Sequence, residues 1–220
     1  MTDINVDQAR YNMIEQQIRP WDVLDPRVLE VLASTPRERF VPKEYQNLAF
    51  TDTEIPLQHG QFMLEPKLEG RILQTLQIKP TDRILEIGTG SGYLTACLGK
   101  LGGSVVSVDI YPEFSQQAQQ QIAGLGLENV EFRVGDAAMG WKQDGDFDVI
   151  VITGSLPMPQ HAFQESLTIG GRMFVVIGDD LLMEAQRILR ISQDVWSNES
   201  LFETHLPALI NAKQPKAFVF

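Results

Sequence analysis

The sequence predicts an α/β fold in which a doubly wound, mostly parallel sheet follows an N-terminal helical cap. From residue 82 onward, short segments rich in Val and Ile alternate with segments of helical periodicity. Strands that are apolar on both faces and separated by helices are typical of a parallel sheet covered on both sides. Three glycines, Gly88, Gly90 and Gly92, follow the first of these strands, where an open α/β sheet binds its ligand.

Three helices are expected before residue 80. The first covers 6–18, where apolar residues recur at helical spacing, and it stops before Pro20. The second begins at Asp25-Pro26, because an aspartate caps a helix well and a proline suits its first turn. Pro66 begins the third helix for the same reason.

The rest of the chain alternates between strands and helices. Short apolar runs bounded by turn residues predict strands at 83–88, 104–109, 130–135, 147–153 and 171–178. Helices are expected at 91–101, 112 to about 125 and 159–167. The tail, 185–220, indicates further strands whose order in the sheet the sequence leaves open. We expect one domain, with a helical cap and substrate-side loop over 1–80 and a cofactor-binding core over 81–220.

Composition and charge exclude several classes of protein. Eighteen basic residues against 29 acidic ones give a formal net charge of −11, which opposes binding to nucleic-acid phosphates. Cys97 is the only cysteine, so no disulfide can form within the chain, and its apolar neighbours predict a buried core thiol. The three histidines have no metal-ligand spacing. With no signal peptide and no membrane-length apolar run, we expect a cytoplasmic protein without nucleic-acid, membrane or metal partners.

The segment LEIGTGSGY (85–93) joins the first strand of the sheet to the following helix. Its glycines let the backbone turn sharply and approach a ligand closely. A dinucleotide-binding loop would need its third glycine one position later, where Tyr93 stands, and the Gly-Lys-Ser/Thr of a P-loop does not follow.

Carboxylates near the ends of the strands point to the class of ligand. Asp109 ends the second strand, where it can accept hydrogen bonds from both hydroxyls of a ribose. Asp136 follows the third strand, where an adenine amino group could donate, and Glu86 is expected within the glycine loop. Three acids around one pocket suit a cationic ligand without phosphates, which favours S-adenosylmethionine. The alternative, that Asp109 and Asp136 only stabilise strand-end turns, stays open.

Nearly the whole chain resembles the protein-L-isoaspartate O-methyltransferases, which are class I, Rossmann-like enzymes that use S-adenosylmethionine. The resemblance is carried by DPRVLEVLASTPRERFVP (25–42), EIPLQHGQ (54–61), LEIGTGSGYLTA (85–96), LENVEFRVGDAAMGW (127–141) and Leu206-Pro207. It implies methyl transfer to the carboxylate of isoaspartyl residues in damaged proteins, with S-adenosylhomocysteine as the second product.

The expected site residues surround the glycine loop and the segment before Pro66. The cofactor-binding residues are expected to be Glu86, Gly88, Thr89, Gly90, Ser91, Gly92, Asp109, Ile110, Asp136 and Ala137. The substrate-binding residues are expected to be His59, Gln61, Phe62, Met63 and Leu64. No catalytic residue is assigned, because Leu64 stands at the position of the family's active-site serine.

The loop before Pro66 departs from the family pattern. The family reads Gly-Gln-Thr-Ile-Ser-x-Pro there, and this chain keeps Gly60, Gln61 and Pro66 but has Phe-Met-Leu at 62–64. An acceptor carboxylate with a pKa of about 4 is already ionised at neutral pH, so the transfer needs no general base. Loss of one positioning hydrogen bond should cost about 1–3 kcal/mol. The triplet either packs in the core or lines an apolar acceptor pocket.

Three hypotheses about function therefore stand. The first is an isoaspartyl carboxyl methyltransferase. The second is a methyltransferase of the same fold with a different, apolar or small-molecule, acceptor. The third is a regulatory protein that binds the cofactor without catalysis, which turnover on any acceptor would exclude.

Overall fold

A computed structural model of the chain describes residues 5–179 and 182–215. Its centre is a seven-stranded sheet in the order β5-β4-β3-β6-β7-β8-β9, which confirms the predicted α/β fold with a mostly parallel sheet. The strands are β3 (Arg83–Ile87), β4 (Ser104–Asp109), β5 (Val130–Val134), β6 (Phe147–Leu156), β7 (Leu167–Asp179), β8 (Leu182–Ser192) and β9 (Val195–Glu203). β3 to β7 pair in parallel, whereas β8 and β9 are antiparallel additions at one edge.

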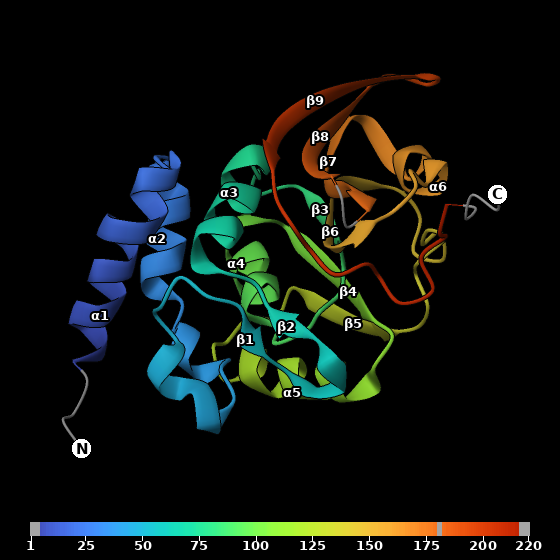
Figure 1. The fold of residues 1–220 in the computed structure, drawn as a ribbon. Coiled ribbons are helices and arrows are strands. Elements are labelled where there is room, and N and C mark those ends of the chain that lie inside the picture. Colours follow the sequence, from blue (N-terminus) through green and yellow to red (C-terminus); the bar gives the residue numbers. More distant parts are fainter. Residues whose placement is uncertain (1–4, 180–181, 216–220) are drawn as a thin grey trace, which may run out of the picture.

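The helices surround this sheet (Figure 1). They are α1 (Val6–Met13), α2 (Pro26–Ser34), α3 (Pro66–Leu76), α4 (Tyr93–Leu101), α5 (Pro112–Ala123) and α6 (His161–Glu165). A π-helical turn over Ile14–Ile18 continues α1, and short 3-10 turns lie at Arg19–Trp21, Arg37–Arg39, Lys43–Leu48 and Gln58–Gly60. A separate small sheet pairs β1 (Ile55–Pro56) with β2 (Phe62–Met63).

Local sequence signals account for most of these boundaries. Asp25 caps α2 as expected, because its side chain accepts a hydrogen bond from the Arg27 backbone N–H at 2.8 Å. Pro66 begins α3, as predicted. The predicted helix over 159–167 is wrong in length: α6 covers only five residues, because Leu167 already begins β7.

The strands at the far edge also differ from the expectation. β6 runs on to Leu156 and β7 begins already at Leu167, because Leu156 pairs with Ile177 of β7 and Leu167 pairs with Phe147 of β6. The tail forms β8 and β9, but 204–215 crosses the sheet's carboxyl edge without a further named strand. The strand expected at 216–220 lies outside the described residues.

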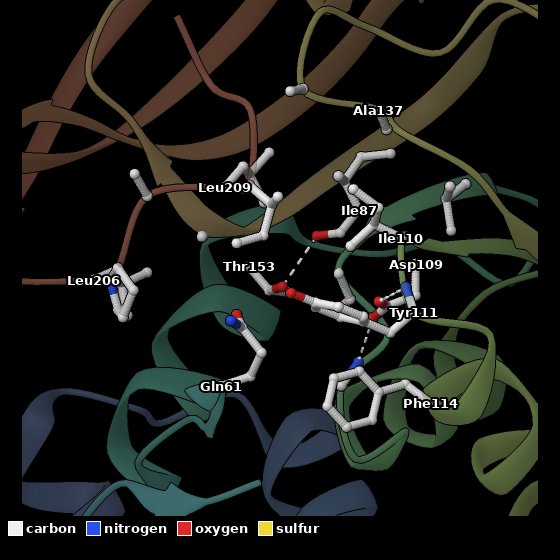
Figure 2. Close-up of a pocket in the computed structure, with 18 of the residues that line it drawn as sticks. Gln61, Ile87, Asp109, Ile110, Tyr111, Phe114, Ala137, Thr153, Leu206 and Leu209 are labelled. Carbon is white, nitrogen blue, oxygen red and sulfur yellow. Dashed lines mark hydrogen bonds between the residues drawn. The ribbon is translucent and has the colours of Figure 1, made fainter. Parts of the chain in front are cut away.

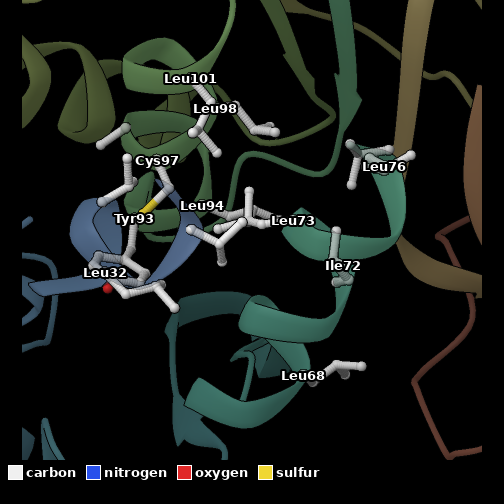
Figure 3. Close-up of a cluster of buried hydrophobic side chains, with 14 of the residues drawn as sticks. Leu32, Leu68, Ile72, Leu73, Leu76, Tyr93, Leu94, Cys97, Leu98 and Leu101 are labelled. Atoms are coloured by element: carbon white, nitrogen blue, oxygen red, sulfur yellow. The ribbon is translucent and has the colours of Figure 1, made fainter. Parts of the chain in front are cut away.

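One hydrophobic core lies between the sheet and the helices α2, α3 and α4 (Figure 3). Leu32, Leu73 and Leu98 meet there, one from each helix, and all are fully buried or nearly so. Cys97 of α4 is fully buried in the same cluster, and burial raises the pKa of its thiol to about 12. This confirms the buried core thiol that the apolar neighbours of Cys97 predict. A second core fills the opposite face of the sheet, around Phe163 of α6.

Among the described residues, no helix is both long enough and apolar enough to cross a membrane.

Glu86 corrects one expectation about the glycine loop. It lies inside β3 and not in the loop, with its side chain fully buried. Its Oε2 accepts hydrogen bonds from Thr95 Oγ1 at 2.5 Å and from Ser107 Oγ at 2.6 Å. Ser107 Oγ is in turn 2.6 Å from Thr89 Oγ1, so the network ties β3, β4 and α4 to the underside of the loop. Burial raises the pKa of Glu86 to about 8.

The raised pKa predicts a pH dependence of stability. A carboxyl group whose pKa rises from 4.5 to about 8 on folding contributes stability that is complete below the unfolded value. That contribution is lost as the pH rises through the folded value, at up to about 1.4 kcal/mol per pH unit. We expect Glu86→Gln to flatten the decline in the free energy of unfolding measured by urea titration from pH 5 to pH 8. Parallel curves for the variant and the unmodified protein would contradict this.

Candidate active site

The candidate site is a pocket at the carboxyl ends of β3, β4 and β6 (Figure 2). In this sheet β4 and β5 lie on one side of β3 and β6 on the other, so the strand order reverses beside β3. Such a reversal leaves a crevice in which open α/β sheets bind ligands. The walls come from the glycine loop, the residues after β4 and β5, the segment before Pro66, and the segment 206–210.

The glycine loop forms the floor of this pocket. Gly88, Gly90 and Gly92 have φ angles of 93°, 52° and 83°, which side chains of L-residues rarely adopt. A Cβ at Gly88 would overlap Thr153 Oγ1 from the end of β6. That hydroxyl donates to the carbonyl oxygens of Ile87 at 3.0 Å and Gly88 at 2.9 Å, which fastens the loop across the crevice.

Asp109 at the end of β4 holds the loop from the other side. Its Oδ2 accepts a hydrogen bond from the Gly90 N–H at 3.0 Å, and its Oδ1 accepts one from the Tyr111 N–H at 2.9 Å. Burial raises the pKa of Asp109, while these backbone donors act in the opposite direction. The carboxylate therefore faces the pocket in a fixed orientation.

Asp136 follows β5 and lies on the same side of the pocket. Its Oδ1 accepts from the Ala138 N–H at 2.9 Å, and its Oδ2 accepts from Asn211 Nδ2 at 2.9 Å. The second bond ties Asp136 to the residue that follows the segment 206–210, and that segment is itself held at Ser155 by a parallel bridge to Ala208. The sequence left open whether Asp136 only stabilises a turn. In the structure it does stabilise the turn, through the Ala138 N–H, and it also lines the pocket.

Residues 54–65, which we call the strap, close the pocket opposite β6. β1 and β2 pair within the strap in antiparallel fashion, and successive side chains in a strand point to opposite faces. Met63 is therefore buried in the core, whereas Phe62, 42% exposed, and Leu64 line the pocket. The triplet is thus divided between the core and the pocket wall, and Leu64 also packs against the core.

A buried ion pair anchors the strap to the helical cap. Arg37 and Glu69 contact each other through Nη1 and Oε2, and both side chains are almost completely buried. Arg37 also donates from Nη2 to the Leu64 carbonyl oxygen at 2.7 Å and from Nε to the Ala49 carbonyl oxygen at 2.9 Å. Burial raises the pKa of Glu69 to about 8, against the opposing effect of Arg37. The only sequence signal of this pair is an acid on the apolar face of α3.

His59 braces the strap against the residues that follow β4. Its φ of 56° is left-handed, and its ring stacks on Tyr111 with centroids 4.1 Å apart. Its Nε2 lies 3.6 Å from Glu113 Oε2. His59 is not part of the pocket wall, but Tyr111 is, and its ring extends towards Thr153 across the pocket (Figure 2).

Apart from His59, which lies outside the pocket wall, the expected site residues divide into three groups by position. The pocket wall contains Gly88, Gly90, Asp109, Ile110, Asp136, Ala137, Gln61, Phe62 and Leu64. A small adjoining cavity is lined by Thr89, Ser91 and Met63. Glu86 and Gly92 lie behind the wall, where a Cβ on Gly92 would crowd Ala118 of α5. Sequence reasoning missed Glu54, Tyr111, Phe114, Thr153 and 208–210 as parts of the wall.

The charges of the pocket suit a cation that carries no phosphate. Its wall contains the carboxylates of Glu54, Asp109 and Asp136, and none of the described residues that line it is Lys or Arg. Within 5–179 and 182–215, no three His, Cys, Asp or Glu side chains are grouped so that they could hold a metal ion. An adenosine with a sulfonium and an ammonium group fits this wall, and a pyrophosphate does not.

Comparison with known proteins gives the same picture. The profile of the protein-L-isoaspartate(D-aspartate) O-methyltransferase family matches residues 8–209. The chain is 36% identical over 182 residues to a protein-L-isoaspartate O-methyltransferase of Protochlamydia amoebophila, which covers 83% of this chain and 86% of that protein. It is 32% identical over 210 residues to protein-L-isoaspartate O-methyltransferase 2 of Pelobacter propionicus, with coverages of 95% and 93%.

A solved structure shares the fold. A Plasmodium falciparum crystal structure, described as a protein-L-isoaspartate O-methyltransferase in complex with S-adenosyl-L-homocysteine, matches with a TM-score of 0.79 and 18% identity. The match covers 93% of this chain and 98% of that one. Together, the family profile and the two relatives show that the chain belongs to the protein-L-isoaspartate(D-aspartate) O-methyltransferase family.

Proposed function

We propose that the protein is an S-adenosylmethionine-dependent methyltransferase that esterifies the free carboxylate of isoaspartyl residues in damaged proteins. The observation that carries the proposal is an acidic, glycine-floored pocket in a chain that matches the family from 8 to 209. The cytoplasm is the proposed compartment, and a lone, buried, uncharged thiol at Cys97 supports it.

The residues of the pocket have distinct roles towards the methyl donor. Asp109 would accept hydrogen bonds from the ribose hydroxyls, and Asp136 one from the adenine amino group. Ile110 and Ala137 supply apolar wall beside them. Gly88 and Gly90, which carry no side chains, let the ligand approach the backbone. When bound, the donor supplies an electrophilic methyl group on a sulfonium.

The acceptor end of the pocket is formed by the strap and 206–210. Gln61 Nε2 donates to the His59 carbonyl oxygen at 3.2 Å, which leaves its second N–H for the acceptor carboxylate. Phe62, Leu64 and Leu209 exclude water around that carboxylate. No base is required, because the nucleophilic oxygen is ionised near neutral pH. The work of the chain is therefore to position and desolvate the acceptor.

The same apolar wall favours a second candidate, a methyltransferase for an apolar small molecule. Phe62 and Leu64 face the pocket in place of the family's two hydroxyl-bearing residues. An assay with matched peptides separates the two functions. We expect base-labile methyl ester from labelled S-adenosylmethionine on an isoaspartyl peptide and none on the same peptide with normal aspartate. Absence of ester on both, with the cofactor bound, would rule out the isoaspartyl function.

Cofactor binding depends on the charge of Asp109. Asp109→Asn keeps the shape of the side chain but removes one acceptor and the charge, so we expect S-adenosylhomocysteine to bind about tenfold more weakly. Calorimetry measures the dissociation constant directly. Asp194→Asn, an identical change in the exposed turn between β8 and β9, serves as the control. An unchanged constant for Asp109→Asn would refute the assignment of the ribose contact.

Leu64 should limit the rate with isoaspartyl peptides. Leu64→Ser restores a hydroxyl at the acceptor end, and one positioning hydrogen bond is worth about 1–3 kcal/mol, so we expect kcat/KM to rise about tenfold. Leu64→Ala removes the same apolar bulk without adding a hydroxyl, and it should not gain. If kcat/KM rose equally in both variants, the gain would come from the space freed by removing Leu64 and not from the new hydroxyl.

A further inference from the structure

Glu54 is the acid of the pocket that the proposed chemistry does not use. It immediately precedes β1, and its partly buried side chain lines the pocket. Its carboxylate makes no hydrogen bond or ion pair with any residue that the structure describes. By contrast, Asp109 and Asp136 each accept two hydrogen bonds. Glu54 is thus the one pocket carboxylate without a partner in the described chain.

Of the groups that act on the charge of Glu54, only His205 compensates it. Burial and the nearby Glu65 raise the pKa of Glu54, while His205 lowers it. Glu65 already has a cationic partner, because Lys67 Nζ lies 3.0 Å from its Oε2. Lys67 is also bonded to Asp52 at 2.8 Å, so it is shared between two other acids. A carboxylate that loses water without gaining a partner is costly, and a cation brought by a ligand would remove that cost.

Glu54 belongs to the acceptor end of the pocket. It is part of the strap, as are Gln61, Phe62 and Leu64. Figure 2 shows Gln61 and Leu206 on the side of the pocket away from Asp109 and Ala137. The methyl donor's adenosine is assigned to Asp109 and Asp136, which leaves two cations for Glu54, the donor's own ammonium group and a basic side chain of the acceptor. Because Glu54 belongs to the strap together with the residues assigned to the acceptor, we assign it to the acceptor's cation.

We propose that Glu54 selects isoaspartyl acceptors that carry a basic side chain, Lys or Arg, next to the isoaspartyl residue; this rests on the proposed function. The acceptor group is itself an anion, and an ionised Glu54 repels it. A neighbouring basic side chain pairs with Glu54 and removes that repulsion. The net charge of −11 acts in the same direction, since it favours the approach of basic peptides over acidic ones.

The test uses three isoaspartyl peptides that differ only in having Lys, Gln or Glu beside the isoaspartyl residue. Transfer of labelled methyl gives KM and kcat, and calorimetry with S-adenosylhomocysteine present gives dissociation constants without turnover. We expect the Lys peptide to have a KM about fivefold lower than the Glu peptide at pH 7.5 and low salt, with similar kcat. Raised salt should reduce the difference.

Glu54→Gln should bring the three KM values together, because it removes the charge and keeps the shape. Since Glu54 has no hydrogen-bond or ion-pair partner to lose among the described residues, this variant should melt at a temperature no lower than that of the unmodified protein. Glu128→Gln removes one charge from an exposed position between α5 and β5, so its net charge equals that of Glu54→Gln, and it should retain the Lys preference.

The possible outcomes distinguish selection by Glu54 from the isoaspartyl activity itself. Equal KM values in the unmodified protein, or a Lys preference that survives Glu54→Gln, overturn the selection by Glu54 and leave the isoaspartyl activity standing. Absence of transfer to all three peptides overturns the proposed function and this inference with it. A Lys preference that is lost in Glu54→Gln and kept in Glu128→Gln supports the proposal.

Discussion

The close approach of β3 and β6 at their carboxyl ends is the constraint on which the rest of the site depends. Thr153 stands where a side chain on Gly88 would have to lie, and its hydroxyl bonds the carbonyl oxygens of Ile87 and Gly88. The chain can leave β3 only through a left-handed glycine turn. That turn directs Gly90 towards Asp109, which bonds its N–H and so joins the loop to the end of β4. Floor and wall of the pocket are therefore one hydrogen-bonded unit.

Buried polar groups beneath and beside the pocket fix geometry more than they add stability. Glu86 receives hydroxyl donors from β4 and α4, and Arg37 pairs with Glu69 while it holds the Leu64 carbonyl oxygen. Replacing such a buried pair by apolar residues is often neutral for stability, whereas removing one partner is costly. Here the two networks place the glycine loop and the strap, the two elements that face each other across the pocket.

The strap explains how a family fold accommodates an altered active-site triplet. Alternation along β2 sends Met63 into the core and leaves Phe62 and Leu64 at the pocket, so one of the three apolar residues is structural and two line the wall to which we assign the acceptor. Methyl transfer to a carboxylate needs alignment and exclusion of water and does not need a base, so we expect the missing hydroxyls to slow the reaction without abolishing it. The same strap brings Glu54 to the acceptor end, where its unpaired charge becomes a means of choosing between acceptors.

Local pattern in the sequence was enough for the fold class, the glycine loop and the strand-end acids, because each depends on residues adjacent in the chain. Asp25 and Pro66 begin their helices as their chemistry predicts, and Asp109 ends β4 as expected. Tertiary structure alone decided the orientation of the apolar triplet, the burial of Glu86, the Arg37–Glu69 pair and the return of 206–210 over the pocket. These features join residues that are far apart in the sequence, such as Leu206 and Gly90 in the pocket wall. The direction of each side chain depends on how its strand pairs with its neighbours. No local periodicity encodes that pairing.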